Sequence, residues 1–317
     1  MDLRDIRSAQ ERIGRYIKQT PLELSRTLSN KLGTNVYVKY ELFQKTGSFK
    51  VRGAFNKLLQ LTPGERSRGV VAVSGGNHAQ AVAHAAKILG IDPVIVMPDS
   101  TPKNYLEATL GYGADVVLKP TIRQAFEEVE SYRQRGLVFL HPFDDPQIMA
   151  GQGTVGAEVM DELPEVTDVV VSIGGGGLAG GVSTAVKSIK PEVRVWGVET
   201  LGADAMNQAL DAGHPVELAE ITSIAKTLGA PQVSELTLKI AQDLMEGVTV
   251  VSDDDAIRAL ILIAERLKVI TEPAASCTLA AAELLRSNFT PESHVVLIFC
   301  GGNISLDDIC RFRMRVK

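Results

Sequence analysis

Residues 47–54 read Gly-Ser-Phe-Lys-Val-Arg-Gly-Ala, and this run decides how the rest of the chain is interpreted. It places Lys50 between an aromatic ring and small residues. A lysine amine becomes a nucleophile or a base only when its pKa falls, which burial or a neighbouring cation can cause. Phe49 offers an apolar wall and Arg52 a second positive charge nearby. The run therefore predicts a reactive lysine, with an ordinary surface lysine as the alternative.

The size and charge of the chain limit the classes of function. Its 317 residues are enough for about two domains with ample core. A net charge of -5 argues against a nucleic-acid partner, because phosphate binding needs a basic face. The N-terminus lacks the apolar core of a signal peptide, and the three cysteines imply no disulfide framework. We therefore expect a cytoplasmic protein.

The uncharged run from Val169 to Val186 reaches the minimum length of a membrane span. Six of its positions are glycine, so we interpret it as a strand, a loop and a helix and expect no membrane partner. Elsewhere, apolar runs rich in β-branched residues alternate with helical stretches, which predicts an α/β fold with parallel sheets flanked by helices. The expected strands are 36–40, 70–74, 93–97, 115–118, 138–140, 168–173, 193–198 and 295–299, and the clearest expected helices are 79–89, 124–134 and 254–267.

Four consecutive glycines, Gly174, Gly175, Gly176 and Gly177, follow the expected strand 168–173 and precede a helix. Such a loop points several backbone N–H groups at one anion, and the helix N-terminus adds a positive partial charge. The loop therefore predicts a phosphate site. Gly175, Gly177 and Gly180 also satisfy G-x-G-x-x-G, and Glu199 follows 24 residues after Gly175. A nicotinamide-dependent (NAD) oxidoreductase is thus an alternative.

Two further motifs follow expected strands. Ser74-Gly75-Gly76-Asn77-His78 stands at a strand-to-helix junction, where ligands gather in open α/β sheets. Its hydroxyl, amide and N–H groups suit a carboxylate or a ring oxygen, with a plain helix cap as the alternative. Cys300-Gly301-Gly302-Asn303 places a thiol at the end of another strand. Buried packing is the alternative there, and nothing beside Cys300 supports a nucleophile.

In this order the four motifs resemble the pyridoxal-phosphate enzymes of fold type II, whose fold is that of the tryptophan synthase β subunit. The nearest likeness is to the threonine/serine dehydratase and serine racemase group, from about residue 15 to about residue 310. The resemblance implies a large cofactor-binding domain of residues 1–52 plus 146–317, a small mobile domain of residues 53–145, and a homodimer.

The resemblance also implies a role for each motif. Lys50 would hold pyridoxal 5'-phosphate as a Schiff base and act as the catalytic base, with Phe49 against the ring and Cys300 at its nitrogen. Asn77 would bond the ring hydroxyl, and Gly174–Gly177 the phosphate. The substrate would lie on Ser74, Gly75, Asn77 and His78. The expected reaction is that of an ammonia-lyase, which dehydrates a β-hydroxy amino acid of the L-threonine or L-serine type to a 2-oxo acid and ammonia.

Three departures from the family pattern bear on function. Serine racemases carry a second serine where this chain has Gly75, so we expect elimination without substantial racemisation, and serine racemase is kept as an alternative. The racemase-type metal site is incomplete, because Ala205 stands where an acidic residue is needed beyond Glu199, so we expect no metal. Lys226 replaces an aspartate, which suggests a more acidic or polar substrate such as 3-hydroxyaspartate or a hydroxyectoine-derived amino acid, with a surface lysine as the alternative. A non-catalytic ligand-binding relative is the last alternative.

Overall fold

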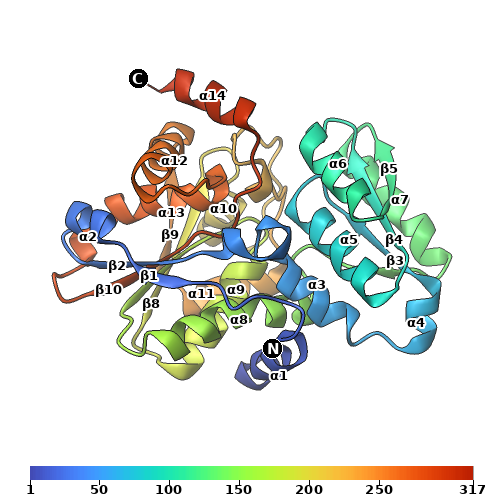
Figure 1. Ribbon diagram of the computed structural model, residues 1–317, viewed down its shortest axis with the longest axis horizontal. Coiled ribbons are helices and arrows are strands. Elements are labelled where there is room, and N and C mark those ends of the chain that lie inside the picture. Colours follow the sequence, from blue (N-terminus) through green and yellow to red (C-terminus); the bar gives the residue numbers. More distant parts are fainter. Residues whose placement is uncertain (317) are drawn as a thin grey trace.

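Two separate β-sheets form the framework of the molecule (Figure 1). The computed structural model describes residues 1–316. The first sheet has six strands in the order β1-β2-β10-β7-β8-β9, and the second has four in the order β5-β4-β3-β6. β1 pairs antiparallel with β2, and the other pairings between these strands are parallel. The strands are β1 (Leu22–Leu24), β2 (Asn35–Lys39), β3 (Val70–Val73), β4 (Pro93–Pro98), β5 (Asp115–Lys119), β6 (Val138–Phe139), β7 (Asp168–Ser172), β8 (Arg194–Thr200), β9 (Gly247–Val251) and β10 (His294–Ile298).

Helices cover both faces of each sheet, which confirms the predicted α/β class. In Figure 1, α8, α9 and α11 lie on one side of the large sheet, and α12 and α13 lie on the other. Helix α5 packs against one face of the small sheet and α7 against the other. The helices are α1 (Leu3–Ile13), α2 (Arg26–Leu32), α3 (Lys50–Leu58), α4 (Pro63–Arg68), α5 (Asn77–Leu89), α6 (Lys103–Gly111), α7 (Ile122–Gln134), α8 (Pro146–Glu162), α9 (Gly177–Ile189), α10 (Ala205–Ala212), α11 (Glu235–Leu244), α12 (Asp253–Leu267), α13 (Pro273–Leu284) and α14 (Leu306–Arg315).

Burial along the central strands explains why the sheets are covered on both sides. Every residue of β3 and of β7 is buried, as expected for strands of a parallel sheet between two helical layers. In β3, Val70 and Ala72 belong to the apolar cluster with α5, whereas Val71 and Val73 belong to the cluster with α7. The uncharged run 169–186 forms β7, the glycine loop and α9, as predicted. No helix among residues 1–316 is both long and apolar enough to cross a membrane.

Close backbone contact fixes the position of α3, the helix that begins at Lys50. A Cβ added to Gly151 of α8 would lie 2.6 Å from the Cα of Gly53, so a larger side chain at Gly151 would push the two helices apart. The strands of the small sheet fall within residues 53–145. The boundaries predicted for the two domains, and the mobility of the smaller one, remain predictions.

Candidate active site

Lys50 is a half-buried residue at the start of α3, and its amine points toward the chain that follows the small sheet. Its Nζ donates a hydrogen bond to the carbonyl oxygen of Pro142 at 2.7 Å and lies 5.2 Å from the centroid of the Phe49 ring. Burial lowers the pKa of Lys50 to about 8, and the nearby Cys300 and Glu272 oppose part of that shift. An amine with this pKa is partly neutral near physiological pH and is therefore available as a nucleophile or a base.

Arg52 does not contribute to this shift in the way the sequence suggested. Its guanidinium forms paired hydrogen bonds with two buried carboxylates: Nε and Nη2 donate to Glu41 at 2.8 and 2.7 Å, and Nη1 and Nη2 donate to Glu158 at 2.6 and 2.9 Å. Its positive charge is compensated within that cluster. The expectation that Arg52 lowers the pKa of Lys50 as a free cation is wrong, because desolvation is the main cause.

A buried carboxylate that the sequence analysis missed, Glu272, lies at the centre of the site. Its Oε1 accepts hydrogen bonds from Asn77 Nδ2 at 2.8 Å and from Thr227 Oγ1 at 3.0 Å. Its Oε2 is buried without a partner among the described residues. Burial raises the pKa of Glu272 to about 7. The available signal was an acidic residue before Pro273, at the start of a helix that is buried from Pro273 to Ala282.

The Asn77 amide joins the motif after β3 to the motif after β10. Its Oδ1 accepts from Asn303 Nδ2 at 2.8 Å, while its Nδ2 donates to Glu272. One amide hydrogen of Nδ2 is left for another acceptor. The backbone N–H of Phe49 donates to the carbonyl oxygen of Cys300 at 3.1 Å, so the motif that contains Lys50 lies beside the motif that contains Cys300. Three of the four sequence motifs thus meet at one place.

The Cys300 side chain is a neutral thiol. It is 2% exposed, accepts from Ser172 Oγ at 3.4 Å and donates to the carbonyl oxygen of Ala274 at 3.5 Å. Burial raises the pKa of Cys300 to about 12, with the Glu272 carboxylate adding to the shift. This thiol is neither a thiolate nucleophile nor a counter-ion for a protonated ring nitrogen.

The glycine loop lies against Phe143, next to the residue that accepts from Lys50. A Cβ on Gly175 would clash with the ring atoms of Phe143, and one on Gly177 would lie 3.0 Å from the Cα of Phe143. Gly176 has φ = 93°, and a Cβ there would lie 2.6 Å from Thr237 Cβ. Phe143 follows Pro142, whose carbonyl oxygen accepts from Lys50. The loop is therefore the fourth motif of the site.

These residues fit pyridoxal phosphate. In the described residues the backbone N–H groups of Gly174–Gly177 donate no hydrogen bond within the protein. They lie at the N-terminus of α9. Such N–H groups suit a phosphate. The partly neutral Lys50 amine suits an aldehyde, and the spare hydrogen of Asn77 suits a ring oxygen. The uncharged thiol of Cys300 suits an unprotonated ring nitrogen.

The predicted substrate-binding residues occupy two different environments. Ser74 Oγ accepts from the backbone N–H of Gly76 at 3.0 Å, so it shapes the loop before α5. His78 is 2% exposed, and its Nε2 lies 2.9 Å from the carbonyl oxygen of Leu140. Burial lowers the pKa of His78 to about 3. The ring is therefore neutral, and only Nδ1 is available for a substrate.

Glu199 and Lys226, which stand where the chain departs from the family pattern, have no visible part in binding within the described part of the chain. Glu199 is buried, and its carboxylate accepts from the backbone N–H groups of Met206 and Asn207 at 2.9 and 2.8 Å. No group of three or more metal-binding side chains is found in residues 1–316. Lys226 is exposed, whereas its neighbour Thr227 reaches Glu272. The structure favours the alternative that Lys226 is a surface lysine. It does not support the hypothesis that Lys226 selects a more acidic or polar substrate.

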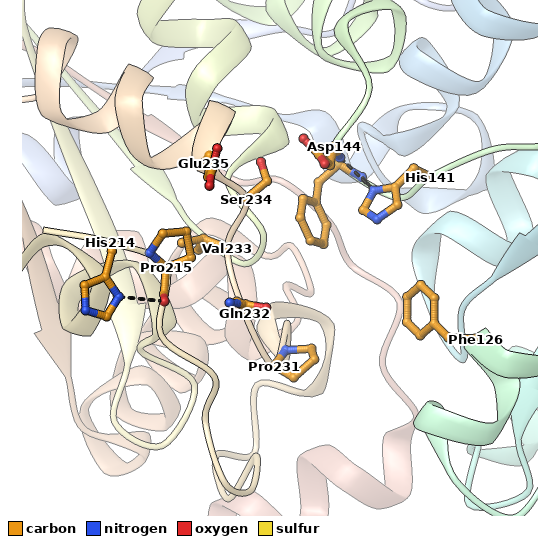
Figure 2. Close-up of a pocket in the computed structure, with 11 residues that line it drawn as sticks. Phe126, His141, Asp144, His214, Pro215, Pro231, Gln232, Val233, Ser234 and Glu235 are labelled. Atoms are coloured by element: carbon orange, nitrogen blue, oxygen red, sulfur yellow. Dashed lines mark hydrogen bonds between the residues drawn. The ribbon is translucent and has the colours of Figure 1, made fainter. Parts of the chain in front are cut away.

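An open pocket of about 530 Å³ lies beside the site (Figure 2). Phe143 lines it and also contacts the glycine loop. In Figure 2 Phe126 projects from the small-sheet side, opposite Gln232 and Pro231. The acidic residues Asp144 and Glu235 and the histidines His141 and His214 line the same pocket.

Comparison with known proteins identifies the family. Residues 13–301 match the model of the family described as pyridoxal-phosphate dependent enzyme. The L-threonine ammonia-lyase of Thermotoga maritima is 40% identical over 98% of this chain and 77% of its own length. The catabolic L-threonine dehydratase of Escherichia coli K12 is 39% identical over 96% of this chain and 94% of its own. The structure of maize serine racemase superposes with a TM-score of 0.93 at 35% identity, covering 99% of this chain and 97% of that one.

The alternative of a nicotinamide-dependent oxidoreductase is wrong. Glu199, the acidic residue of that fingerprint, has both oxygens engaged by backbone N–H groups of α10 and is buried. The glycine loop instead lies beside Phe143, whose neighbour Pro142 accepts from Lys50, and follows Ser172, which donates to Cys300. With the family model matching most of its length, the chain belongs to the pyridoxal-phosphate dependent enzymes of fold type II, and pyridoxal phosphate is its cofactor.

Proposed function

We propose that this protein is an ammonia-lyase that dehydrates a β-hydroxy amino acid of the L-threonine or L-serine type to a 2-oxo acid and ammonia. The observation that carries the proposal is the buried Lys50 amine, with a pKa near 8, beside a Cys300 thiol that stays neutral. The relatives named as threonine ammonia-lyase and threonine dehydratase support it.

Lys50, Cys300, Asn77 and the glycine loop have different roles in this reaction. Pyridoxal phosphate, when bound, withdraws electrons from the substrate Cα. The Lys50 amine would be the base for the Cα proton, and its lowered pKa allows it to accept a proton near neutral pH. Cys300, as a neutral thiol, does not stabilise a protonated ring nitrogen. An unprotonated ring would draw less electron density from the substrate Cα, which would favour prompt loss of the hydroxyl from Cβ as water. The backbone of Gly174–Gly177 and the Asn77 amide hold the cofactor in register.

The test combines trapping of the cofactor with product analysis. Borohydride treatment of the holoenzyme should leave a reduced cofactor on the peptide that contains Lys50, as measured by mass spectrometry. Ammonia and 2-oxo acid are then measured across L-threonine, L-serine, 3-hydroxyaspartate and a hydroxyectoine-derived amino acid. Lys50→Ala should lose the adduct and at least about a thousandfold in turnover. Lys103→Ala, a change at an exposed lysine, is the matched control. A trapped cofactor without turnover of any substrate in the wild type would contradict the proposal and favour a binding protein.

We propose further that the enzyme eliminates without substantial racemisation. Gly75 places no acid or base of its own on the second face of the substrate Cα. Chiral chromatography of an L-serine reaction should show pyruvate with D-serine below about one hundredth of it. Comparable amounts of D-serine and pyruvate would refute this and support the serine racemase alternative.

The proposed setting is a homodimer in the cytoplasm that acts on a small amino acid. The three cysteines form no disulfide, which agrees with a reducing compartment. The homodimer rests on the family resemblance. Light scattering of the holoenzyme should give a mass of twice 34.1 kDa.

A further inference from the structure

The space beside Gly75 is filled by a hydroxyl from another segment. A Cβ added to Gly75 would lie 2.5 Å from Thr101 Oγ1 and 3.5 Å from both Thr101 Cβ and the Cδ of Pro98. A side chain at residue 75 would therefore collide with Thr101. The missing side chain of the loop and the hydroxyl of Thr101 occupy the same region of the site.

The topology of the small sheet brings the two residues together. β3 and β4 are parallel neighbours, with Val73 opposite Val96. The loop from Ser74 follows β3 and the loop from Asp99 follows β4, so both leave the carboxyl edge of the sheet, where ligands bind in α/β proteins. The backbone N–H of Thr101 donates to the carbonyl oxygen of Pro98, and this turn directs the chain back toward Gly75.

The Thr101 hydroxyl is buried and has no hydrogen-bond partner in the described residues. An unsatisfied buried hydroxyl is unfavourable, which is why native structures generally pair such groups. The neighbouring polar groups of the loop are only partly engaged: Ser74 Oγ accepts from Gly76, and the Asn77 amide contacts Glu272 and Asn303 but keeps one free hydrogen. Thr101 is thus a free donor beside the loop proposed to receive the substrate.

We propose that Thr101 is a substrate-binding residue whose hydroxyl donates a hydrogen bond to the substrate carboxylate on the Ser74–Asn77 loop. The inference rests on the proposed function, because it takes that loop as the carboxylate site. A carboxylate satisfies the lone hydroxyl, and a hydrogen bond to a charged acceptor is stronger than one to a neutral group. The chain thereby supplies from the β4 loop a hydroxyl that Gly75 cannot supply.

The test compares ligands with and without a carboxylate. Thr101→Val keeps the shape and removes the hydroxyl, and Thr101→Ser keeps the hydroxyl. Binding of L-alanine, which has no β-leaving group, and of ethylamine, which has no carboxylate, is measured on each holoenzyme by calorimetry. Thr101→Val should weaken L-alanine about tenfold or more and leave ethylamine within about twofold. Thr101→Val should also raise KM for the hydroxy amino acid by a similar factor and leave kcat within about threefold of the wild-type value. Thr101→Ser should resemble the wild type.

Two results would overturn the inference. One is equal L-alanine affinity in the wild type and Thr101→Val. The other is D-serine formation by the wild type that Thr101→Val abolishes at unchanged L-alanine affinity, which would make the hydroxyl an acid on the second face.

Gly75→Ser combined with Thr101→Ala, which moves the hydroxyl to the other loop, should recover the affinity for L-alanine. Absence of 2-oxo acid from every substrate would refute the proposed function, whereas the L-alanine and ethylamine comparison would still test Thr101.

Discussion

The Lys50 amine differs from the exposed lysines of the chain because it is largely removed from water. Burial disfavours the charged ammonium, and the Cys300 and Glu272 side chains only partly offset that effect. The neutral amine is the reactive form, so its reactivity should rise with pH until the pKa is passed. Because the pKa is near 8 and not near 10.5, this rise should end within the accessible pH range.

The pH dependence of cofactor uptake by the apoprotein tests this value. The neutral fraction of a group with a pKa of 8 increases about tenfold from pH 7 to pH 9 and then levels off. A lysine with an unshifted pKa would gain about a hundredfold and still be rising. The rate of appearance of the bound-cofactor absorbance should follow the first curve for the apoprotein and the second curve for free N-acetyl-lysine, measured in parallel. A curve still rising steeply above pH 9 would contradict the lowered pKa.

At the scale of single residues, the sequence predicts chemistry where a residue lies within a motif. Lys50, Asn77, Cys300 and the glycine loop were found in this way, and the structure brings them together. Glu272 and Thr227 were missed because they approach the site from segments far away in the chain. Thr101 was missed for the same reason, since only the pairing of β3 with β4 places it beside Gly75.

At the scale of elements, the predicted strands of the two sheets were found close to their expected bounds, because buried β-branched runs are distinctive. Helices α8 and α13 were not predicted. Both are buried over most of their length, and α13 consists largely of small residues, so neither shows an apolar stripe with a period of 3.6 residues. β9 is only partly buried at four of its five positions, which weakens its signal in the sequence.

The glycine loop offers a prediction with a matched control. Gly176→Ala adds a methyl group 2.6 Å from Thr237 Cβ at a residue with φ = 93°, so the loop must shift. Gly213→Ala imposes comparable strain at φ = 75° but meets nothing within 4 Å. We expect Gly176→Ala to weaken pyridoxal phosphate at least about tenfold, because preorganised N–H groups are displaced. Gly213→Ala should cost about 1 kcal/mol of stability and leave cofactor affinity unchanged.

Equilibrium titration of the apoproteins with pyridoxal phosphate, followed by absorbance, measures both affinities. Equal affinities for the two variants would show that the glycine loop does not hold the phosphate.

At the scale of the whole molecule, a buried ion cluster joins the start of α3 to the large-sheet region. Arg52 of α3 contacts Glu158 of α8 and Glu41, which follows β2. Lys39 at the end of β2 also pairs with Glu158, at 2.8 Å. The cluster and the Gly53–Gly151 contact therefore hold the segment that carries Lys50 in place.

Removal of the central cation should destabilise the protein strongly. Arg52→Met leaves Glu41 buried without an ionic partner, which costs about 3–5 kcal/mol. Urea unfolding of the apoprotein measures the change. The double variant Arg52→Met/Glu41→Gln should recover part of the loss, because the uncompensated charge is gone. Arg123→Ala, at a residue that is 89% exposed, should remain within about 0.5 kcal/mol of the wild type. An Arg52→Met variant as stable as Arg123→Ala would show that the cluster is not a structural support.

The same burial that keeps Cys300 a neutral thiol has a practical consequence for labelling. Cys300 and Cys277 are both enclosed and both have pKa values raised by burial, whereas Cys310 on α14 is exposed. A maleimide dye should therefore attach at Cys310 alone in the folded protein. α14 lies on the outside of the molecule, beyond α12 (Figure 1). The natural sequence thus provides a single attachment point for fluorescence or surface immobilisation, without engineering and without contact with the cofactor site.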